Sequence, residues 1–138
     1  SNQEKLAHTI HQNLLPLMSD CNMAIPQIAN YAMFLTEQQE PERGISELQK
    51  LSGIIKEYHS DDCLDYAKVQ ETLGTIYLMT ANLPQAKTHF KRAFKIYEKI
   101  WADEPEMIEA KYQEIQELYP QVGFFLGQQI SSFLTKQA

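Results

Sequence analysis

The stretch ETLGTIYLMTANLPQAKTHFKRAFKIYEKI, from Glu71 to Ile100, reads as two amphipathic helices joined by a turn. Apolar residues recur at helical spacing in both halves, which is typical of helices with one buried face. They are Leu73, Ile76 and Tyr77, with Val69 just before the stretch, followed by Ala86, Phe90, Ala93, Phe94 and Tyr97. Asn82-Leu83-Pro84 breaks the pattern, and proline suits the first turn of a helix. The stretch therefore predicts a helical hairpin.

A period of 42 residues extends this hairpin along the chain. A shift of 42 places Leu35 on Tyr77, Gly44 on Ala86, Leu48 on Phe90, Ile54 on Ile96 and Asp61 on Asp103. A second shift places Tyr77 on Tyr119. Self-similarity at a fixed period of roughly 20 to 50 residues indicates stacked structural repeats.

We expect about seven helices, at 3–18, 24–38, 42–58, 63–80, 84–101, 105–119 and 123–135. Pro120 and Gly123 are expected to separate the last two. The chain, 1–138, is interpreted as a single helical domain. It would contain an N-terminal helix in 1–23, a degenerate repeat in 24–62, the best repeat in 63–104, and a partial repeat with a closing helix in 105–138. Because the chain starts with Ser1-Asn2 rather than Met, we expect it to be a fragment of a larger protein.

The overall charge and hydropathy exclude some classes of protein. The net charge of −6 argues against a nucleic-acid-binding face, which needs basic side chains to neutralise phosphates. No apolar run approaches the roughly 20 residues that span a bilayer, so no membrane contact is expected. Nothing resembles a signal peptide, and we expect a cytoplasmic location.

The residues that most often carry chemistry do not form a recognisable site. His8 and His11 have a spacing that suits a metal, but no third ligand is fixed near them. The acids around Cys63, which are Asp61, Asp62 and Asp65, are expected to cap a helix. The sequence contains no phosphate-binding glycine loop, nucleophile elbow or zinc-protease motif. We therefore predict no catalysis, no cofactor and no metal site.

Cys21 and Cys63 are separated by one period. Equivalent positions in successive repeats should lie roughly 15 to 20 Å apart, given the usual spacing of packed helices. A disulfide needs Cα atoms within about 7 Å. We therefore predict two thiols rather than a disulfide.

The hairpin from Glu71 to Ile100 resembles a tetratricopeptide repeat. That family places Leu, Gly and Tyr along its first helix and Ala, Phe and Ala along its second. Here these positions hold Leu73, Gly74, Tyr77, Ala86, Phe90 and Ala93. The family's tryptophan position holds Gln70, and no closing proline stands near Glu98. The period exceeds the usual length of about 34 and is similar to that of kinesin-light-chain-like arrays. The resemblance implies an all-α fold, a right-handed solenoid of stacked antiparallel helix hairpins.

The resemblance also implies a function in binding proteins or peptides. In the family the first helices of the hairpins line a concave groove that receives a peptide or a partner helix. The corresponding residues are Asn30, Met33, Thr36, Lys68, Glu71, Thr72, Thr75, Leu78, Gln113, Glu114 and Glu117. Glu71, Glu114 and Glu117 would repel an acidic tail, so a neutral, basic or amphipathic ligand is expected.

The resulting hypothesis is a non-catalytic interaction scaffold. One alternative is the peptide-sensing domain of a bacterial helix-turn-helix transcription regulator. Another is a tetratricopeptide appendage of a signalling enzyme. A third is a homodimer that forms through the C-terminal helix, where Phe124, Phe125 and Phe133 lie near the end of the stack.

One helix is rich in basic residues. Lys87, Lys91, Arg92, Lys95 and Lys99 lie on it, and Asp103, Glu104, Glu106 and Glu109 follow it. A basic helix face is able to meet an anionic partner. We expect the acids to neutralise this face and the helix to pair within the stack.

Overall fold

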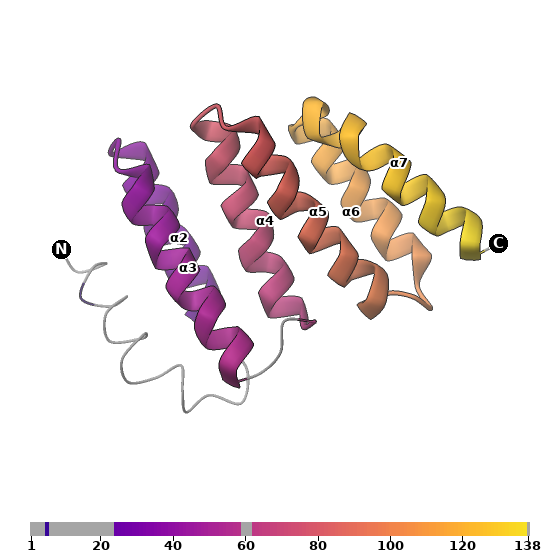
Figure 1. The fold of residues 1–138 in the computed structure, drawn as a ribbon, viewed down its shortest axis with the longest axis horizontal. Helices are drawn as coiled ribbons and strands as arrows, with labels where there is room; N and C mark the ends of the chain where they lie inside the picture. The colour runs from indigo at the N-terminus through magenta and orange to yellow at the C-terminus, as the bar shows by residue number, and fades with distance from the viewer. Residues whose placement is uncertain (1–4, 6–23, 59–61, 138) are drawn as a thin grey trace.

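The structure is a computed structural model that describes Lys5, residues 24–58 and residues 62–137. These residues form six helices and no strand: α2 (Ala24–Glu37), α3 (Pro41–Tyr58), α4 (Leu64–Met79), α5 (Leu83–Ile100), α6 (Pro105–Leu118) and α7 (Pro120–Gln137) (Figure 1). The all-α expectation is confirmed. The helix expected at 3–18 lies outside the described residues, apart from Lys5.

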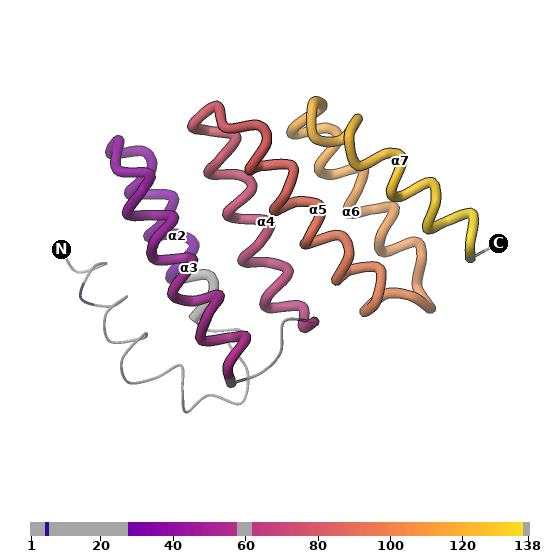
Figure 2. Tube along the Cα trace, viewed as in Figure 1, coloured from indigo at the N-terminus to yellow at the C-terminus, as the bar shows by residue number. Residues whose placement is uncertain are grey.

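The six helices form three hairpins, α2–α3, α4–α5 and α6–α7, which stand side by side (Figures 1 and 2). The second helices α3, α5 and α7 face the viewer in Figure 1. We call the side formed by α3, α5 and α7 the outer face, and the side formed by α2, α4 and α6 the inner face. The arrangement is that of a helical solenoid.

The first two hairpins turn in the same way, 42 residues apart. Gln39 and Ala81 have the left-handed φ values of 64° and 60°. The amide of Glu40 donates to the carbonyl of Leu35, and the amide of Asn82 donates to the carbonyl of Tyr77, both at 2.8 Å. This is the Schellman arrangement, which satisfies carbonyls at the end of a helix. The sequence period is thus also a period of backbone geometry.

The third hairpin turns differently, and here the expected boundary is wrong. Pro120 and Gly123 do not separate two helices, because α7 already begins at Pro120. Proline is well tolerated at the first helical position, where its missing N–H group would have no intrahelical partner. Tyr119 alone joins the two helices, with a φ of −138°. The shift of 42 residues therefore fails after Tyr119.

Each second helix carries a small residue three positions after its first residue. These residues are Gly44, Ala86 and Gly123, and all three are buried. A Cβ atom at Gly44 would lie 2.6 Å from the carbonyl oxygen of Ala32, and one at Gly123 would lie 2.7 Å from the Cα atom of Gln116. Real Cβ atoms do not approach other atoms this closely, so the absent side chain sets the distance between the helices.

The core consists of two clusters that meet at α4. The first joins α2, α3 and α4 through residues such as Ile28, Leu48 and Leu73. The second joins α5, α6 and α7 through Phe90, Phe94, Tyr97, Ile115 and Leu126, and includes Ala67 of α4. The expected apolar positions of the central hairpin are buried, except Tyr77, which is half-buried. Since α4 contributes to both clusters, the hairpins bury their apolar faces against one another.

Candidate functional site

The eleven predicted groove residues lie on α2, α4 and α6, the helices of the inner face. None of them belongs to the buried core. The exposed members are Asn30, Lys68, Gln113, Glu114 and Glu117, and the half-buried members are Met33, Thr36, Glu71, Thr72, Thr75 and Leu78. Side chains on the first helices of three successive hairpins therefore remain available to a ligand at the surface.

The three threonines of this set use their hydroxyl hydrogens within their own helices. Thr36, Thr72 and Thr75 each donate to the carbonyl oxygen four residues earlier, over 2.9, 3.0 and 3.1 Å respectively. A hydroxyl oxygen keeps acceptor capacity after it donates. These threonines thus offer acceptors rather than donors to a ligand.

Glu71 joins three helices. The hydroxyl of Tyr97, on α5, donates to Oε2 of Glu71 over 2.6 Å, and Nζ of Lys111, on α6, lies 3.0 Å from Oε1. Lys111 also lies 3.6 Å from Oε2 of Glu114. Burial, and next the charge and hydrogen bond of Glu71, raise the pKa of Tyr97, so its hydroxyl stays protonated. Part of the expected negative charge of the inner face is therefore offset by Lys111.

Lys111 is not among the groove residues that the sequence predicts. Its pairing with Glu114 is readable, because the two residues are three positions apart on one helix. Its pairing with Glu71 depends on how α4 and α6 stack, and no local pattern predicts that contact.

A second polar cluster lies inside the molecule, between α3, α4 and α5. Gln70, at the family's tryptophan position, is only 2% exposed. Its Oε1 lies 2.7 Å from Nδ1 of His89 and 3.4 Å from Nη1 of Arg92, and its Nε2 donates to Oγ of Ser52 over 3.4 Å. Because an amide oxygen accepts, Nδ1 of His89 carries the hydrogen in this contact. The amide therefore links three helices by donating and accepting hydrogen bonds, whereas an indole ring has a donor only.

His89 is held in its neutral form. Its ring is buried and stacks on Tyr77, with 5.3 Å between ring centroids. Burial, and secondarily the charge of Arg92, lower the pKa of His89 from 6.5 to about 4. No local sequence pattern indicates this cluster, since the partners of Gln70 lie 18 to 22 residues away from it in the chain.

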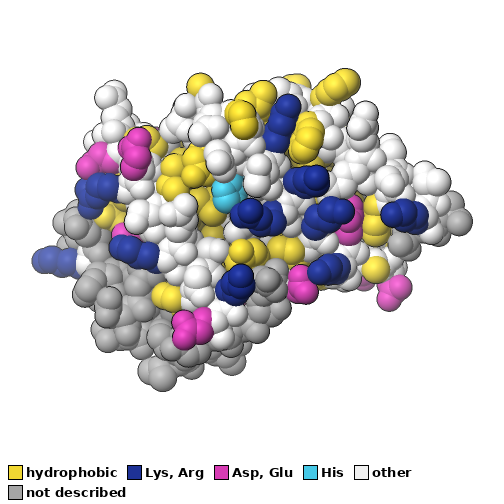
Figure 3. All heavy atoms as spheres, in the orientation of Figure 1, with side chains coloured by type: hydrophobic (Ala, Val, Ile, Leu, Met, Phe, Trp, Pro, Cys, Tyr) yellow, Lys and Arg dark blue, Asp and Glu magenta, His cyan; other side chains and the backbone are white. Residues whose placement is uncertain are grey.

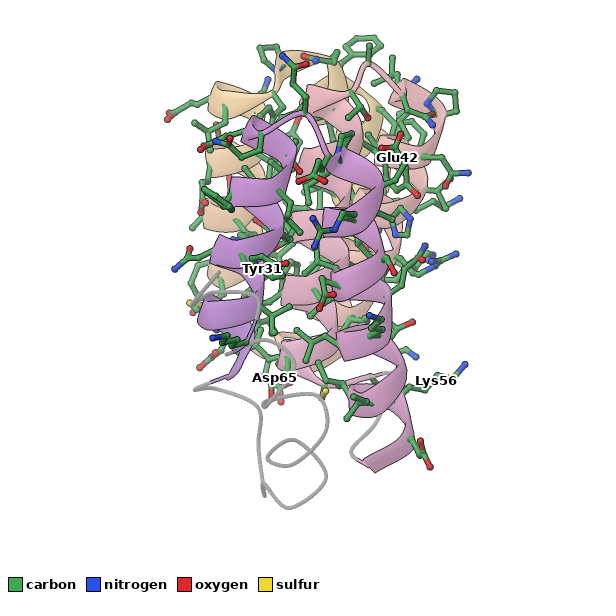
Figure 4. All side chains as sticks on the ribbon, turned by 90° about the vertical axis from the view of Figure 1, so that its left-hand side faces the viewer. Tyr31, Glu42, Lys56 and Asp65 are labelled. Atoms are coloured by element: carbon green, nitrogen blue, oxygen red, sulfur yellow. The ribbon has the colours of Figure 1, made fainter. Side chains whose placement is uncertain are left out.

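The outer face is basic. Lys87, Lys91, Lys95 and Lys99 stand four residues apart on α5, with Arg92 beside them, Lys56 on α3 and Lys136 on α7. Figure 3 shows Lys and Arg side chains in a band across this face. Figure 4 shows Lys56 pointing outward from α3. Together they are seven of the twelve Lys and Arg residues of the chain.

The acids that follow α5 do not pair with this row. Within the described residues, no ion pair of 4.0 Å or less joins Asp103, Glu104, Glu106 or Glu109 to a lysine of α5. The ion pair that does form there joins Lys99 to Asp62, over 2.9 Å. The expected neutralisation by these acids therefore does not take place through direct contact.

The aromatic residues expected near the end of the stack have different environments. Phe133 is buried, Phe125 lies under Lys87 with 5.2 Å between Nζ and the ring centroid, and Phe124 is 87% exposed. Phe124 borders a hollow of about 680 Å³ between α6 and α7, which Ile130 and Leu134 also line. An apolar surface thus remains at the end of the third hairpin.

The described part of the chain holds no group of three His, Cys, Asp or Glu side chains placed to bind a metal ion. His8, His11, Cys21 and Asp61 lie outside the described residues. The two-thiol prediction therefore stays a prediction. At the start of α4, Cys63 is the N-cap residue and its side chain makes no capping hydrogen bond, while Asp65 lies in the first turn. None of the helices in the described segments is long and apolar enough to cross a membrane.

The comparison with known families agrees with this geometry. A family model described as "Tetratricopeptide repeat" matches residues 23–99, which is more than half of the chain and covers α2 to α5 except for the last residue of α5. The chain belongs to the tetratricopeptide repeat family. No curated protein and no solved structure matches it significantly. The match ends where the regular turn geometry of this tetratricopeptide repeat protein also ends, before the third hairpin.

Proposed function

We propose that this tetratricopeptide repeat domain is a non-catalytic scaffold that binds a peptide or a helix of a partner protein on its inner face. Tetratricopeptide repeats generally mediate protein–protein interactions. The observation that supports the site is that all eleven groove residues stay outside the core, on the first helices of three successive hairpins. The cytoplasmic setting expected from the sequence remains a prediction.

The chemistry of the inner face favours a neutral to basic, amphipathic ligand. Met33 and Leu78 offer partly exposed apolar surface, and the threonine oxygens offer acceptors for backbone or side-chain N–H groups. Lys111 offsets the charge of Glu71. Glu114 and Glu117 are exposed and outweigh Lys68, so an acidic ligand would be repelled.

Selection from a displayed peptide library would test this proposal. The groove variant Asn30→Ala with Gln113→Ala changes two exposed residues and leaves the Glu71 network intact. Peptides selected by the native domain should lose about tenfold in affinity for this variant, a loss of about 1.4 kcal/mol. Fluorescence anisotropy with a labelled synthetic peptide measures the change.

The matched control is Lys91→Gln with Lys95→Gln, on the outer face. It should leave the affinity of the selected peptides unchanged. If no peptide is enriched, or if both variants lose affinity equally, the inner face is not the binding site.

We propose self-association as a second candidate function, because Phe124 and Leu118 are 87% and 60% exposed near the end of the stack. A homodimer through this surface would bury both side chains. Sedimentation of the native domain should then show a dimer that Phe124→Asp abolishes. A native domain that stays monomeric at high concentration would rule this out.

A further inference from the structure

The lysine row of α5 is electrostatically unfavourable for the isolated domain. Lys87, Lys91, Lys95 and Lys99 form three successive pairs at i, i+4, and like charges at this spacing repel. Lys91 and Lys95 are exposed and make no ion pair within the described residues. Although Lys99 pairs with Asp62, the middle of the row, Lys91 and Lys95, therefore keeps positive charge that is unpaired among the residues the structure describes, in a domain whose net charge is −6.

This row borders two hollows on the outer face. The first, of about 330 Å³, lies between α5 and α7 and is lined by three lysines, one carboxylate and one aromatic ring: Lys91, Lys95, Lys136, Glu98 and Phe133. The second, of about 540 Å³, lies between α3 and α5. It is lined by Lys56, Arg92, Lys95 and Lys99, and by Asp62, whose carboxylate pairs with Lys99. Lys95 lines both hollows, which therefore adjoin each other on the two sides of α5.

The lining of these hollows combines positive charge with other chemistry. Gln128, Gln129 and Ser132 add amide and hydroxyl groups to the smaller hollow, and Tyr66 and Ile96 add apolar surface to the larger one. Carboxylates would pair with the lysines, and a small apolar side chain would contact Phe133 or Ile96. These groups occur together in an acidic stretch of polypeptide.

We propose that the outer face of α5, between α3 and α7, binds an acidic, Asp- and Glu-rich segment of a partner protein. This surface is separate from the inner face, and its use does not depend on a ligand in the groove. The carboxylates of the segment would remove the repulsion along the lysine row.

The extent of the basic row favours a short protein segment over a longer polyanion. From Lys87 to Lys99 the row covers about 18 Å of helix. Beyond it lie the exposed acids Asp103, Glu104 and Glu106. A nucleic acid or a membrane surface would extend over these acids and be repelled, whereas a helical segment of about twelve residues, about 18 Å long, fits within the row.

The test uses a fluorescein-labelled peptide of about twelve residues with Glu at i, i+4 spacing, and a control peptide in which Gln replaces each Glu. Fluorescence anisotropy at low ionic strength measures binding to the native domain. The test variant is Lys91→Gln with Lys95→Gln. The charge-matched control is Lys5→Gln with Lys50→Gln, two exposed lysines outside the patch.

We expect the native domain to bind the Glu peptide and not the Gln peptide, and the test variant to bind about tenfold more weakly. The control variant should bind as the native domain does. The melting temperature of the test variant should not fall, because both side chains are exposed and like-charge repulsion is removed. Carbodiimide, which joins carboxylates to lysines in contact with them, should link the Glu peptide to Lys91 or Lys95 in the unmodified domain.

The proposal is overturned if the native domain does not bind the Glu peptide, if both variants weaken binding equally, or if the crosslinks fall elsewhere. It is also overturned if a single-stranded oligonucleotide, or vesicles containing phosphatidylserine, bind more tightly than the peptide. The groove test is distinguished from this one by its variants: a groove peptide loses affinity in Asn30→Ala with Gln113→Ala, whereas a peptide on the lysine row loses affinity in Lys91→Gln with Lys95→Gln.

Discussion

The first two hairpins and the third hairpin each pack two helices closely together, but their turns differ. In α2–α3 and α4–α5, a left-handed residue and a Schellman arrangement reverse the chain at equivalent positions 42 residues apart. In α6–α7, the single residue Tyr119 lies between the two helices, because Pro120 is already the first residue of α7. The small residue three positions into the second helix is nevertheless retained in all three hairpins. All three hairpins therefore share the close approach of their two helices, whereas the conformation of the turn differs between them.

The largest expected loss of stability comes from a substitution in the core cluster that joins the second hairpin to the third. Phe90 is fully buried in this cluster. Phe90→Ala should lower the free energy of unfolding by about 3 to 5 kcal/mol, because it removes apolar contacts and leaves a cavity. Urea denaturation followed by circular dichroism measures this loss.

Phe124→Ala is the matched control for Phe90→Ala. Phe124 is 87% exposed, and its removal should change stability by less than about 0.5 kcal/mol in a monomer. Equal losses in the two variants would mean that the second core cluster does not hold the third hairpin.

The next largest effect on stability should come from the small residue near the start of the second helix, and the first and third hairpins can be compared at this position. Gly44→Ala and Gly123→Ala should each cost about 1 to 3 kcal/mol, because the new Cβ would press on backbone atoms of the partner helix. Thermal and urea unfolding of the two variants provide the comparison.

Gly53→Ala is the control for these two substitutions. Gly53 lies within α3, and a Cβ there meets nothing within 4 Å. This variant should gain about 0.5 to 1 kcal/mol, since alanine is the better helix former. If Gly123→Ala gains stability as Gly53→Ala does, the close approach of α6 and α7 does not require glycine at position 123.

A pH dependence should distinguish the central hairpin from its neighbours. Folding lowers the pKa of His89 from 6.5 to about 4, so the unfolded chain binds a proton more readily than the folded chain does. This contribution to stability is complete above pH 6.5 and is lost as the pH falls toward about 4. Urea midpoints across this range should decrease, and they should decrease less in His89→Gln. An identical pH slope in both proteins would show that His89 is not the group responsible.

The smallest expected effect concerns the turns of the first two hairpins. Ala81 and Gln39 adopt left-handed conformations in which a Cβ atom is unfavourable. Ala81→Gly and Gln39→Gly should each stabilise the domain by about 0.5 to 1 kcal/mol. Gln38→Gly, next to Gln39 but without a positive φ, should instead destabilise it. Thermal unfolding tests all three, and a loss in both turn variants would contradict the explanation.

Much of the solenoid could be predicted because it follows from local periodicity. Five of the six described helices begin within one residue of the predicted position, since apolar spacing and turn residues mark them. The sixth, α7, begins at Pro120, three residues before its predicted start, because Pro120 occupies the first helical position instead of breaking the chain between two helices. A rule based on proline at the first helical position would have located it.

The polar contacts of the molecule could not be predicted in the same way. Gln70 was noted as a departure from the family pattern, but its amide contacts with Ser52, His89 and Arg92 depend on how three helices stack. The pair between Glu71 and Lys111 is also a product of stacking. The eleven groove residues remain a prediction, supported by their position outside the core.

The shared helix α4 has a consequence for how the chain folds. One core cluster draws on residues from Ile28 to Ile76 and the other on residues from Ala67 to Phe133, so neither requires the two halves of the chain to meet first. Local topology of this kind gives short loops to close and a low contact order, which is typical of rapid folding. We expect either cluster to nucleate independently, with α4 as the template on which the other half then assembles.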